Sequence, residues 1–156
     1  MGAFLVNGHS TCKRLASALR AVGFQGDIEQ DSALLAAMST DNSVYQIYPD
    51  LVVAPSCAQD LVTLLRVVAA PEYAHVAITA RGGGTGTNGQ SLNTGVIIDL
   101  RRHMSQLIEL DVVDGWADVQ PGMVLGDLNE QIRNTGWFFA PETSTSTRCT
   151  IGGMVS

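Results

Sequence analysis

The first part of the chain carries apolar residues at helical spacing. A first helix is predicted to begin at Ser10 or Thr11, either of which can cap it, and to end at Gly23. Its packing face consists of residues three or four positions apart, namely Leu15, Leu19 and Val22. The opposite side, which we expect to be solvated, carries Cys12, Lys13, Arg14 and Arg20.

A second, shorter helix is predicted after Asp31 or Ser32. Its apolar face consists of Leu34, Leu35 and Met38. It breaks in residues 39–43, a run of side chains that hydrogen-bond their own backbone and favour turns. Residues 1–47 are therefore expected to form an N-terminal helical segment.

From residue 48 the pattern changes to alternating strand and helix. Residues 51–54 are predicted to form a buried strand, and Pro55 ends it. A helix should follow, with Ser56 and Gln59 as a capping box and Leu61, Leu64, Leu65 and Val68 along one stripe. Pro71 stops this helix before the next strand, 76–79. This succession predicts a parallel strand pair with a right-handed crossover.

The remaining elements are predicted to be short. Residues 96–100 form a β-branched strand, and Asp114-Gly115 marks a type I′ hairpin turn between 107–113 and 116–120. A helix carrying Val124, Leu125, Leu128 and Ile132 on one face closes at Gly136. The aromatic residues 137–139 are expected in the core. Together these elements predict a mixed α/β (α+β) fold.

Composition narrows the class of protein. The chain has 156 residues, 46% of them apolar, and a mean hydropathy of +0.16, as expected of a globular domain. No apolar run approaches a membrane span, and the N-terminus lacks the pattern of a signal peptide. The net charge of −6 and the single lysine disfavour nucleic acid as a partner. Three cysteines without metal-ligand spacing indicate reduced thiols in a cytoplasmic protein and no metal site.

The candidate chemistry centres on the glycine-rich stretch 82–91, which has five glycines in its first eight residues. A bare backbone lets a bulky anion approach, and successive amide N–H groups can replace the water around a diphosphate. Arg81 adds a local positive charge in an otherwise acidic chain. The stretch is thus a candidate phosphate cradle, with candidate residues Arg81, Gly82, Gly83, Gly84, Thr85 and Gly86.

Other interpretations of this stretch compete. The spacing Gly84-x-Gly86-x-x-Gly89 satisfies the dinucleotide fingerprint, but that motif needs a helix at the loop, and a turn and strand follow instead. A P-loop needs a lysine where Gln90 stands. A strand–loop–strand pyrophosphate site fits both flanks, and a surface turn without a ligand is the plain alternative.

A second pair of glycines, Gly152 and Gly153, could also bring amide groups against a ligand near the end of the chain. No closing strand or helix is expected after Gly153. None of the three histidines has a carboxylate or serine in a recognisable catalytic motif. No residue is therefore assigned as a catalytic base.

With both glycine segments in view, the chain resembles flavoproteins of the vanillyl-alcohol-oxidase type, which have a PCMH-type FAD-binding domain. The segments that carry the resemblance are 39–45, 49–55, 81–86, Pro121-Gly122, 139–142 and 149–153. Within that group the chain is similar to the branch of FAD-linked D-lactate dehydrogenases, the FAD subunit of glycolate oxidase and D-2-hydroxyglutarate dehydrogenases.

The resemblance implies two small α/β subdomains with FAD stretched between them, in an incomplete FAD-binding domain over residues 48–156. Residues 82–86 with Gln90 and Ser91 would wrap the pyrophosphate. The flavin and ribityl side would be approached by Pro141, Glu142 and the second glycine segment, including Cys149, Thr150, Gly152 and Gly153. Some members attach FAD through a histidine in the first glycine loop, but residues 85–88 are Thr, Gly, Thr and Asn, so noncovalent FAD is predicted.

The resemblance also implies a function. We expect the N-terminal part of an FAD-dependent oxidoreductase that oxidises a 2-hydroxy acid, with the substrate bound by a C-terminal domain that this chain lacks. One alternative is a catalytically silent flavin-binding fragment, and the isolated chain is expected to be inactive. A Rossmann-type NAD-binding protein is the third hypothesis.

Overall fold

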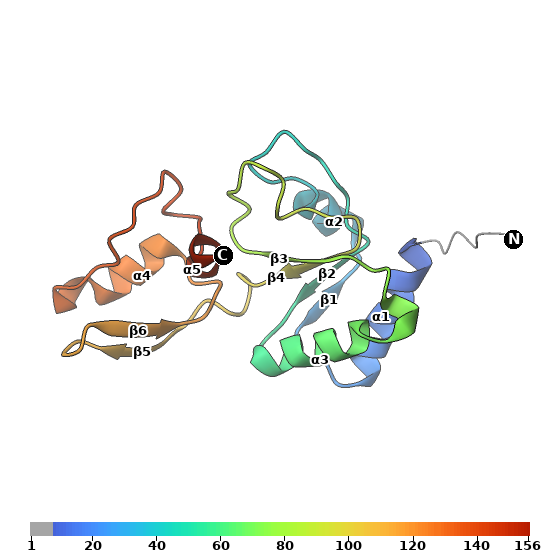
Figure 1. The fold of residues 1–156 in the computed structure, drawn as a ribbon, viewed down its shortest axis with the longest axis horizontal. Helices are drawn as coiled ribbons and strands as arrows, with labels where there is room; N and C mark the ends of the chain where they lie inside the picture. Colours follow the sequence, from blue (N-terminus) through green and yellow to red (C-terminus); the bar gives the residue numbers. More distant parts are fainter. Residues whose placement is uncertain (1–7) are drawn as a thin grey trace, which may run out of the picture.

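The computed structural model describes residues 8–156, which form two units side by side (Figure 1). The first unit contains α1 (Gly8–Ala21), β1 (Asp27–Glu29), α2 (Ser32–Met38), β2 (Leu51–Ala54), α3 (Ala58–Val68), a 3-10 turn (Pro71–Tyr73), β3 (Ile78–Arg81) and β4 (Val96–Asp99). The second contains β5 (Leu107–Asp111), β6 (Trp116–Val119), α4 (Leu125–Ile132), a 3-10 turn (Arg133–Thr135) and α5 (Ile151–Val155). The mixed α/β prediction is confirmed.

The first unit is built on a four-stranded sheet with strand order β1-β2-β4-β3. β1 runs antiparallel to β2, whereas β2 and β3 both pair with β4 in parallel. β2 and β3 therefore run parallel to each other, as predicted, but they are not neighbours, because β4 lies between them. Every residue of β2 and β4 is buried, as expected for central parallel strands covered on both faces.

The helices of the first unit cover both faces of this sheet (Figure 1). α1 and α3 share a core with β2 and β4, whereas α2 lies on the other side. β1 and α1 come from residues before 48, so the N-terminal part of the chain contributes to the same core. Among residues 8–156 no helix combines the length and the apolarity needed to cross a membrane.

Three expectations about helix faces are wrong. Cys12 is buried in the core rather than solvated, while Val22 and Leu65 are more than half exposed. The Ser56–Gln59 capping box does not form: Cys57 is the N-cap of α3 and its side chain makes no cap bond. Instead, the carboxylate of Asp60, in the first turn of the helix, accepts bonds from the Ser56 amide and hydroxyl at 2.8 and 2.7 Å.

The second unit packs one face of the β5–β6 hairpin on α4. Its small core contains Met123, Leu128 and Ile132, with Leu107, Leu110, Val119 and Ile151 against them. The predicted hairpin is present, but its turn is not type I′. Asp114 has no positive φ, Gly115 alone takes φ +71°, and the Gly115 amide donates to the Asp111 carbonyl at 3.0 Å.

Two expectations about the C-terminal stretch are also wrong. The aromatic residues 137–139 are exposed rather than in the core, because they follow the left-handed Gly136 and cross the outside of the small unit. The second glycine pair lies inside a short helix, α5, although no closing element was expected. Thr150 begins this helix, and its hydroxyl accepts a bond from the Gly153 amide at 3.4 Å.

Candidate functional site

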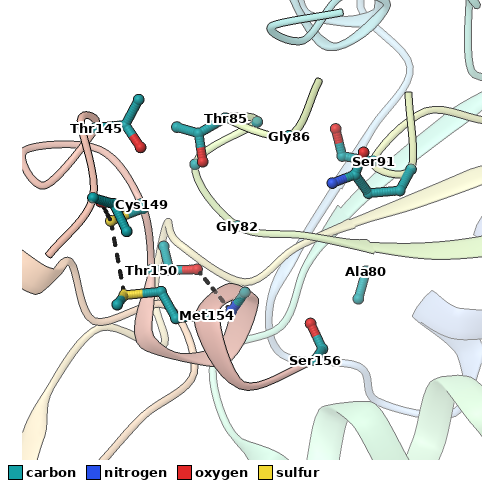
Figure 2. A pocket seen from close by; sticks show the side chains of 15 residues that line it. Ala80, Gly82, Thr85, Gly86, Ser91, Thr145, Cys149, Thr150, Met154 and Ser156 are labelled. Carbon is teal, nitrogen blue, oxygen red and sulfur yellow. Dashed lines mark hydrogen bonds between the residues drawn. The ribbon is translucent and has the colours of Figure 1, made fainter. Parts of the chain in front are cut away.

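A cavity of about 390 Å³ at the carboxyl end of β3 is lined by residues of both units. Figure 2 shows the side chains that line it. One wall is the loop between β3 and β4, and the other is the segment that leads into α5. Ten of the predicted site residues line this cavity: Gly82, Gly83, Gly84, Thr85, Gly86, Gln90, Ser91, Cys149, Thr150 and Gly153. The structure thus brings together two segments that lie more than fifty residues apart in the chain.

The glycine loop, residues 82–91, runs from strand to strand without a helix. β3 ends at Arg81, and β4 begins at Val96 after a turn held by Asn93. The Asn93 side-chain amide donates to the Thr79 hydroxyl at 2.6 Å and to the Val96 carbonyl at 3.1 Å, which fixes the return of the chain. Because no helix begins here, the dinucleotide fingerprint is not realised and the strand–loop–strand interpretation fits.

Bare glycines allow the two walls to approach each other. A Cβ at Gly82 would collide with the Thr150 hydroxyl, and one at Gly83 would collide with the Arg148 carbonyl oxygen. At these positions any side chain would push the units apart or fill the cavity. Close approach therefore explains why the sequence carries consecutive glycines here.

The cavity offers backbone amides and hydroxyls rather than charges. Within residues 8–156, the N–H groups of residues 82–86 donate no hydrogen bond to another residue. Thr85, Ser91, Thr145 and Thr150 also line the cavity, and among residues 8–156 no Asp, Glu, Lys or Arg does so (Figure 2). Such a neutral, donor-rich surface can hold an anion through local dipoles.

The second wall is positioned by α4 and the segment before it. The Leu125 amide donates to the Cys149 carbonyl at 3.1 Å, and the Ile151 amide donates to the Met123 carbonyl at 2.8 Å. The Cys149 sulfur lies 3.0 Å from the Thr143 hydroxyl and 3.8 Å from the Met154 sulfur (Figure 2). These contacts fix the thiol at the edge of the cavity.

Four predicted residues do not line this cavity. Pro141 and Glu142 line a neighbouring cavity of about 360 Å³, beside α4, which shares Thr143 with the first. Gly152 faces away and packs against Pro121. Arg81 lies behind the glycine loop, where its guanidinium donates to the carbonyls of Met38 and Thr40 at 3.3 and 2.7 Å.

The segment 38–45 on the far side of Arg81 also contacts the glycine loop. Burial raises the pKa of Asp41, but hydrogen bonds from Ser43 and Ser91 and the charge of Arg81 outweigh it, so the net shift is downward. Burial lowers the pKa of Arg81, and the charges of Asp41 and Asp99 oppose that shift. Each of these partly buried charges therefore favours the charged form of the other.

Sequence reasoning missed five residues that line the cavity: Ala80, Thr143, Thr145, Met154 and Ser156. Thr143 and Thr145 belong to a run of hydroxyl residues, 143–147, which is the signal that the sequence offers for this part of the wall. Met154 and Ser156 reach the cavity because residues 151–155 are helical, which the glycines at 152 and 153 concealed. Among residues 8–156 no group of three or more His, Cys, Asp or Glu side chains could hold a metal ion.

Comparison with known proteins gives consistent results. Residues 49–156 match the family described as the FAD binding domain. The chain is 47% identical over 134 residues to D-2-hydroxyglutarate dehydrogenase from Escherichia coli, which covers 86% of this chain and 13% of that protein. It is 34% identical over 113 residues to glycolate oxidase subunit GlcD from Bacillus subtilis, covering 72% of this chain and 23% of that protein.

Solved structures share the fold. Alkyldihydroxyacetonephosphate synthase superposes with a TM-score of 0.78 at 20% identity, covering 90% of this chain and 28% of that one. p-Cresol methylhydroxylase gives 0.78 at 17% identity, covering 97% and 30%. Glucooligosaccharide oxidase from Acremonium strictum, whose FAD is described as 6-S-cysteinyl and 8α-N1-histidyl, gives 0.69 at 21% identity, covering 90% and 29%.

Proposed function

The chain belongs to the family of FAD binding domains, and from this premise we propose that it binds FAD with the diphosphate in the cavity between its two units. The glycine loop would hold the diphosphate through its amides, together with the Gln90 side chain, whereas the Ser91 hydroxyl already donates to the Asp41 carboxylate. The single observation that carries this proposal is that residues 82–86, whose amides donate no hydrogen bond within residues 8–156, line a cavity without charged side chains together with Cys149, Thr150 and Gly153.

The residues present fit this ligand. Two phosphates bring negative charge, and five amides with several hydroxyls can replace their water without a basic field, in a chain whose net charge is −6. The cavity of about 390 Å³ is at the small end for a whole cofactor. We propose that the rest of FAD extends toward the neighbouring cavity that Pro141 and Glu142 line.

We also propose that FAD is held noncovalently. No histidine lines the cavity within residues 8–156, although Cys149 does, and a cysteine is one attachment point named for glucooligosaccharide oxidase. The Cys149 thiol contacts Thr143 and Met154. Acid precipitation of the loaded protein tests this: noncovalent flavin stays in the supernatant, whereas covalent flavin precipitates with the chain.

We propose further that the activity is oxidation of a 2-hydroxy acid of the D-2-hydroxyglutarate, D-lactate or glycolate type. The support is sequence similarity to the dehydrogenase and the oxidase subunit above, of which this chain spans only 13% and 23%. FAD supplies a hydride acceptor when bound, and the protein must supply orientation, a base and a partner for the carboxylate. The cavity wall within residues 8–156 has no charged side chain, so we place those groups in other parts of the full-length protein.

This proposal makes the present chain a cofactor-binding part, to which we assign residues 48–156, in a protein we expect in the cytoplasm. The test is equilibrium dialysis of the purified chain against FAD, with ADP and NAD as competitors. FAD binding that ADP weakens supports the diphosphate site. Binding of NAD without FAD would revive the Rossmann hypothesis, and no binding of any of them would refute the proposal. Dye reduction by D-2-hydroxyglutarate or D-lactate, expected to be absent for the isolated chain, separates binding from turnover.

A further inference from the structure

Residues 38–45 form a turn that lies along the back of the glycine loop; we call it the 38–45 turn. It begins at the last residue of α2 and is closed by a hydrogen bond from the Ile47 amide to the Ser39 carbonyl at 2.8 Å. The Asn42 amide donates to the Gly84 carbonyl at 3.0 Å, so the turn is joined to the middle of the glycine loop. The Tyr45 ring lies against Gly89, further along the loop.

Arg81 joins the start of the glycine loop to this turn. Its guanidinium donates to two backbone carbonyls of the turn, Met38 at 3.3 Å and Thr40 at 2.7 Å. A planar fork of donors suits two neighbouring acceptors, which an ammonium group cannot match in the same geometry. The guanidinium also packs beneath Gly84, because a Cβ built there would lie 2.6 Å from one of its nitrogens.

Asp41 joins the end of the glycine loop to the same turn. Its carboxylate accepts a bond from the buried Ser91 hydroxyl at 2.9 Å and one from the Ser43 amide at 2.8 Å. The opposite charge of Arg81 lies nearby and stabilises the ionised carboxylate. The glycine loop is therefore held at its start by Arg81, in its middle by Asn42 and at its end by Asp41.

From these contacts we propose that the 38–45 turn is a brace that shapes the glycine loop before a ligand arrives, and that Arg81 and Asp41 are positioning residues rather than phosphate ligands. This inference rests on the proposed FAD site. The pattern of the sequence suggested that Arg81 contacts phosphate, but its guanidinium does not line the cavity and is engaged by two carbonyls.

A brace lowers the entropic cost of ordering such a loop. Glycine loses more backbone freedom on ordering than any other residue, and residues 82–89 include five glycines. Without fixed contacts, the binding of a ligand would have to offset that ordering entropy. Contacts made in the free protein reduce this cost, so loss of the brace should appear both in the free loop and in ligand affinity.

The test compares five variants of the present chain: Arg81→Met, Arg81→Lys, Asp41→Asn, the double variant Arg81→Met/Asp41→Asn and the control Asp60→Asn. Asp60 is a matched control because its buried carboxylate also accepts bonds from a serine hydroxyl and from backbone amides, but in the α3 turn away from the loop. Two readouts are taken: amide hydrogen exchange of residues 82–91 without ligand, and FAD affinity at several ionic strengths.

We expect Arg81→Met and Asp41→Asn each to speed exchange in the loop and to weaken FAD binding about tenfold, the effect of losing one hydrogen bond to a charged group. The double variant should be no worse than the poorer single one within about twofold, because both residues act through one brace. Arg81→Lys should recover less than half of the lost affinity. The ionic-strength dependence of binding should stay that of the unmodified chain.

Three results would overturn the inference. The first result would show that Arg81 is a direct phosphate ligand. Arg81→Met would then bind FAD more weakly with unchanged loop exchange and a flatter ionic-strength dependence, and Arg81→Lys would recover the full affinity. Another is an equal loss of affinity in Asp60→Asn, which would indicate general destabilisation. If the unmodified chain binds no FAD, the proposed function fails and exchange in the free chain decides alone: faster loop exchange in Arg81→Met supports the brace, and unchanged exchange refutes it.

Discussion

Replacing Gly83 with alanine would place a methyl group against the backbone of the opposite unit. The new Cβ would collide with the Arg148 carbonyl oxygen and lie 2.8 Å from its carbonyl carbon, and contacts under 3.0 Å force something to shift. The obstacle is main chain, so no side chain can rotate out of the way. Overpacking of this kind costs about 1–3 kcal/mol, and we expect that loss in the free energy of unfolding.

The effect on binding follows from the same displacement. Relieving the clash moves the glycine loop away from the Arg148–Thr150 segment, so the amides and hydroxyls no longer converge on one anion. We expect this displacement to cost at least about 1.4 kcal/mol of binding free energy, which is a tenfold loss of FAD affinity. The assay is a flavin fluorescence titration beside a denaturant melt.

Gly23→Ala is the control for this prediction. Gly23 has φ +82° with no atom within 4 Å of an added Cβ, so alanine is strained there by about 1–2 kcal/mol without a clash. It should lose comparable stability and keep its FAD affinity. If Gly83→Ala binds FAD as tightly as the unmodified chain, the close approach of the two walls is not what forms the site.

Three further predictions concern other parts of the molecule. Burial, and then the charge of Asp50, raise the pKa of Cys12 to about 11. A thiol reagent at pH 8 should therefore label Cys57 first and Cys12 only on unfolding. Rapid labelling of both remaining thiols, Cys12 and Cys149, in a Cys57→Ser variant would refute this. Burial raises the pKa of Asp60, but bonds from Gln25 and Ser56 outweigh it and hold the pKa below its ordinary value of 3.8. Its stabilisation is therefore present above that value and is lost as the pH falls through the folded pKa, so Asp60→Asn should cost about 1–3 kcal/mol at pH 7 and flatten the acid limb of a stability–pH curve; a parallel curve would contradict this. Phe138 is 69% exposed, so Phe138→Ser should change the free energy of unfolding by less than about 0.5 kcal/mol. A loss well above this value would show that the Phe138 ring packs in the core.

Much of the fold could be predicted because its signals are local. Leu15 and Leu19 at helical spacing, the apolar run 51–54 and the stripe of α4 each define one element. Strand order could not be predicted in this way. β4 lies between β2 and β3, and the sequence of β3 carries no pattern that indicates which strand it pairs with. The predicted exposure of a side chain was wrong where its contacts come from distant elements. Cys12 is buried in the core that α1 shares with α3 and β2, and the pattern of α1 alone does not indicate those contacts.

The glycine loop could be located from sequence because only bare backbone tolerates the approach that Gly82 and Gly83 make. That both glycine segments line one cavity came from the resemblance, and the structure brings ten of their predicted residues together there. The groups that the Arg81 guanidinium contacts could not be predicted, because an arginine beside a glycine loop can bind either a phosphate or two backbone carbonyls. Its carbonyl acceptors are about forty residues earlier, in the 38–45 turn.

The central claim is tested most directly by assigned amide spectra of the chain with and without FAD. The account predicts that the N–H signals of residues 82–86 shift and become protected from exchange on FAD addition, and that ADP reproduces the effect at these residues. FAD binding that leaves those five amides unchanged while perturbing another surface would contradict it.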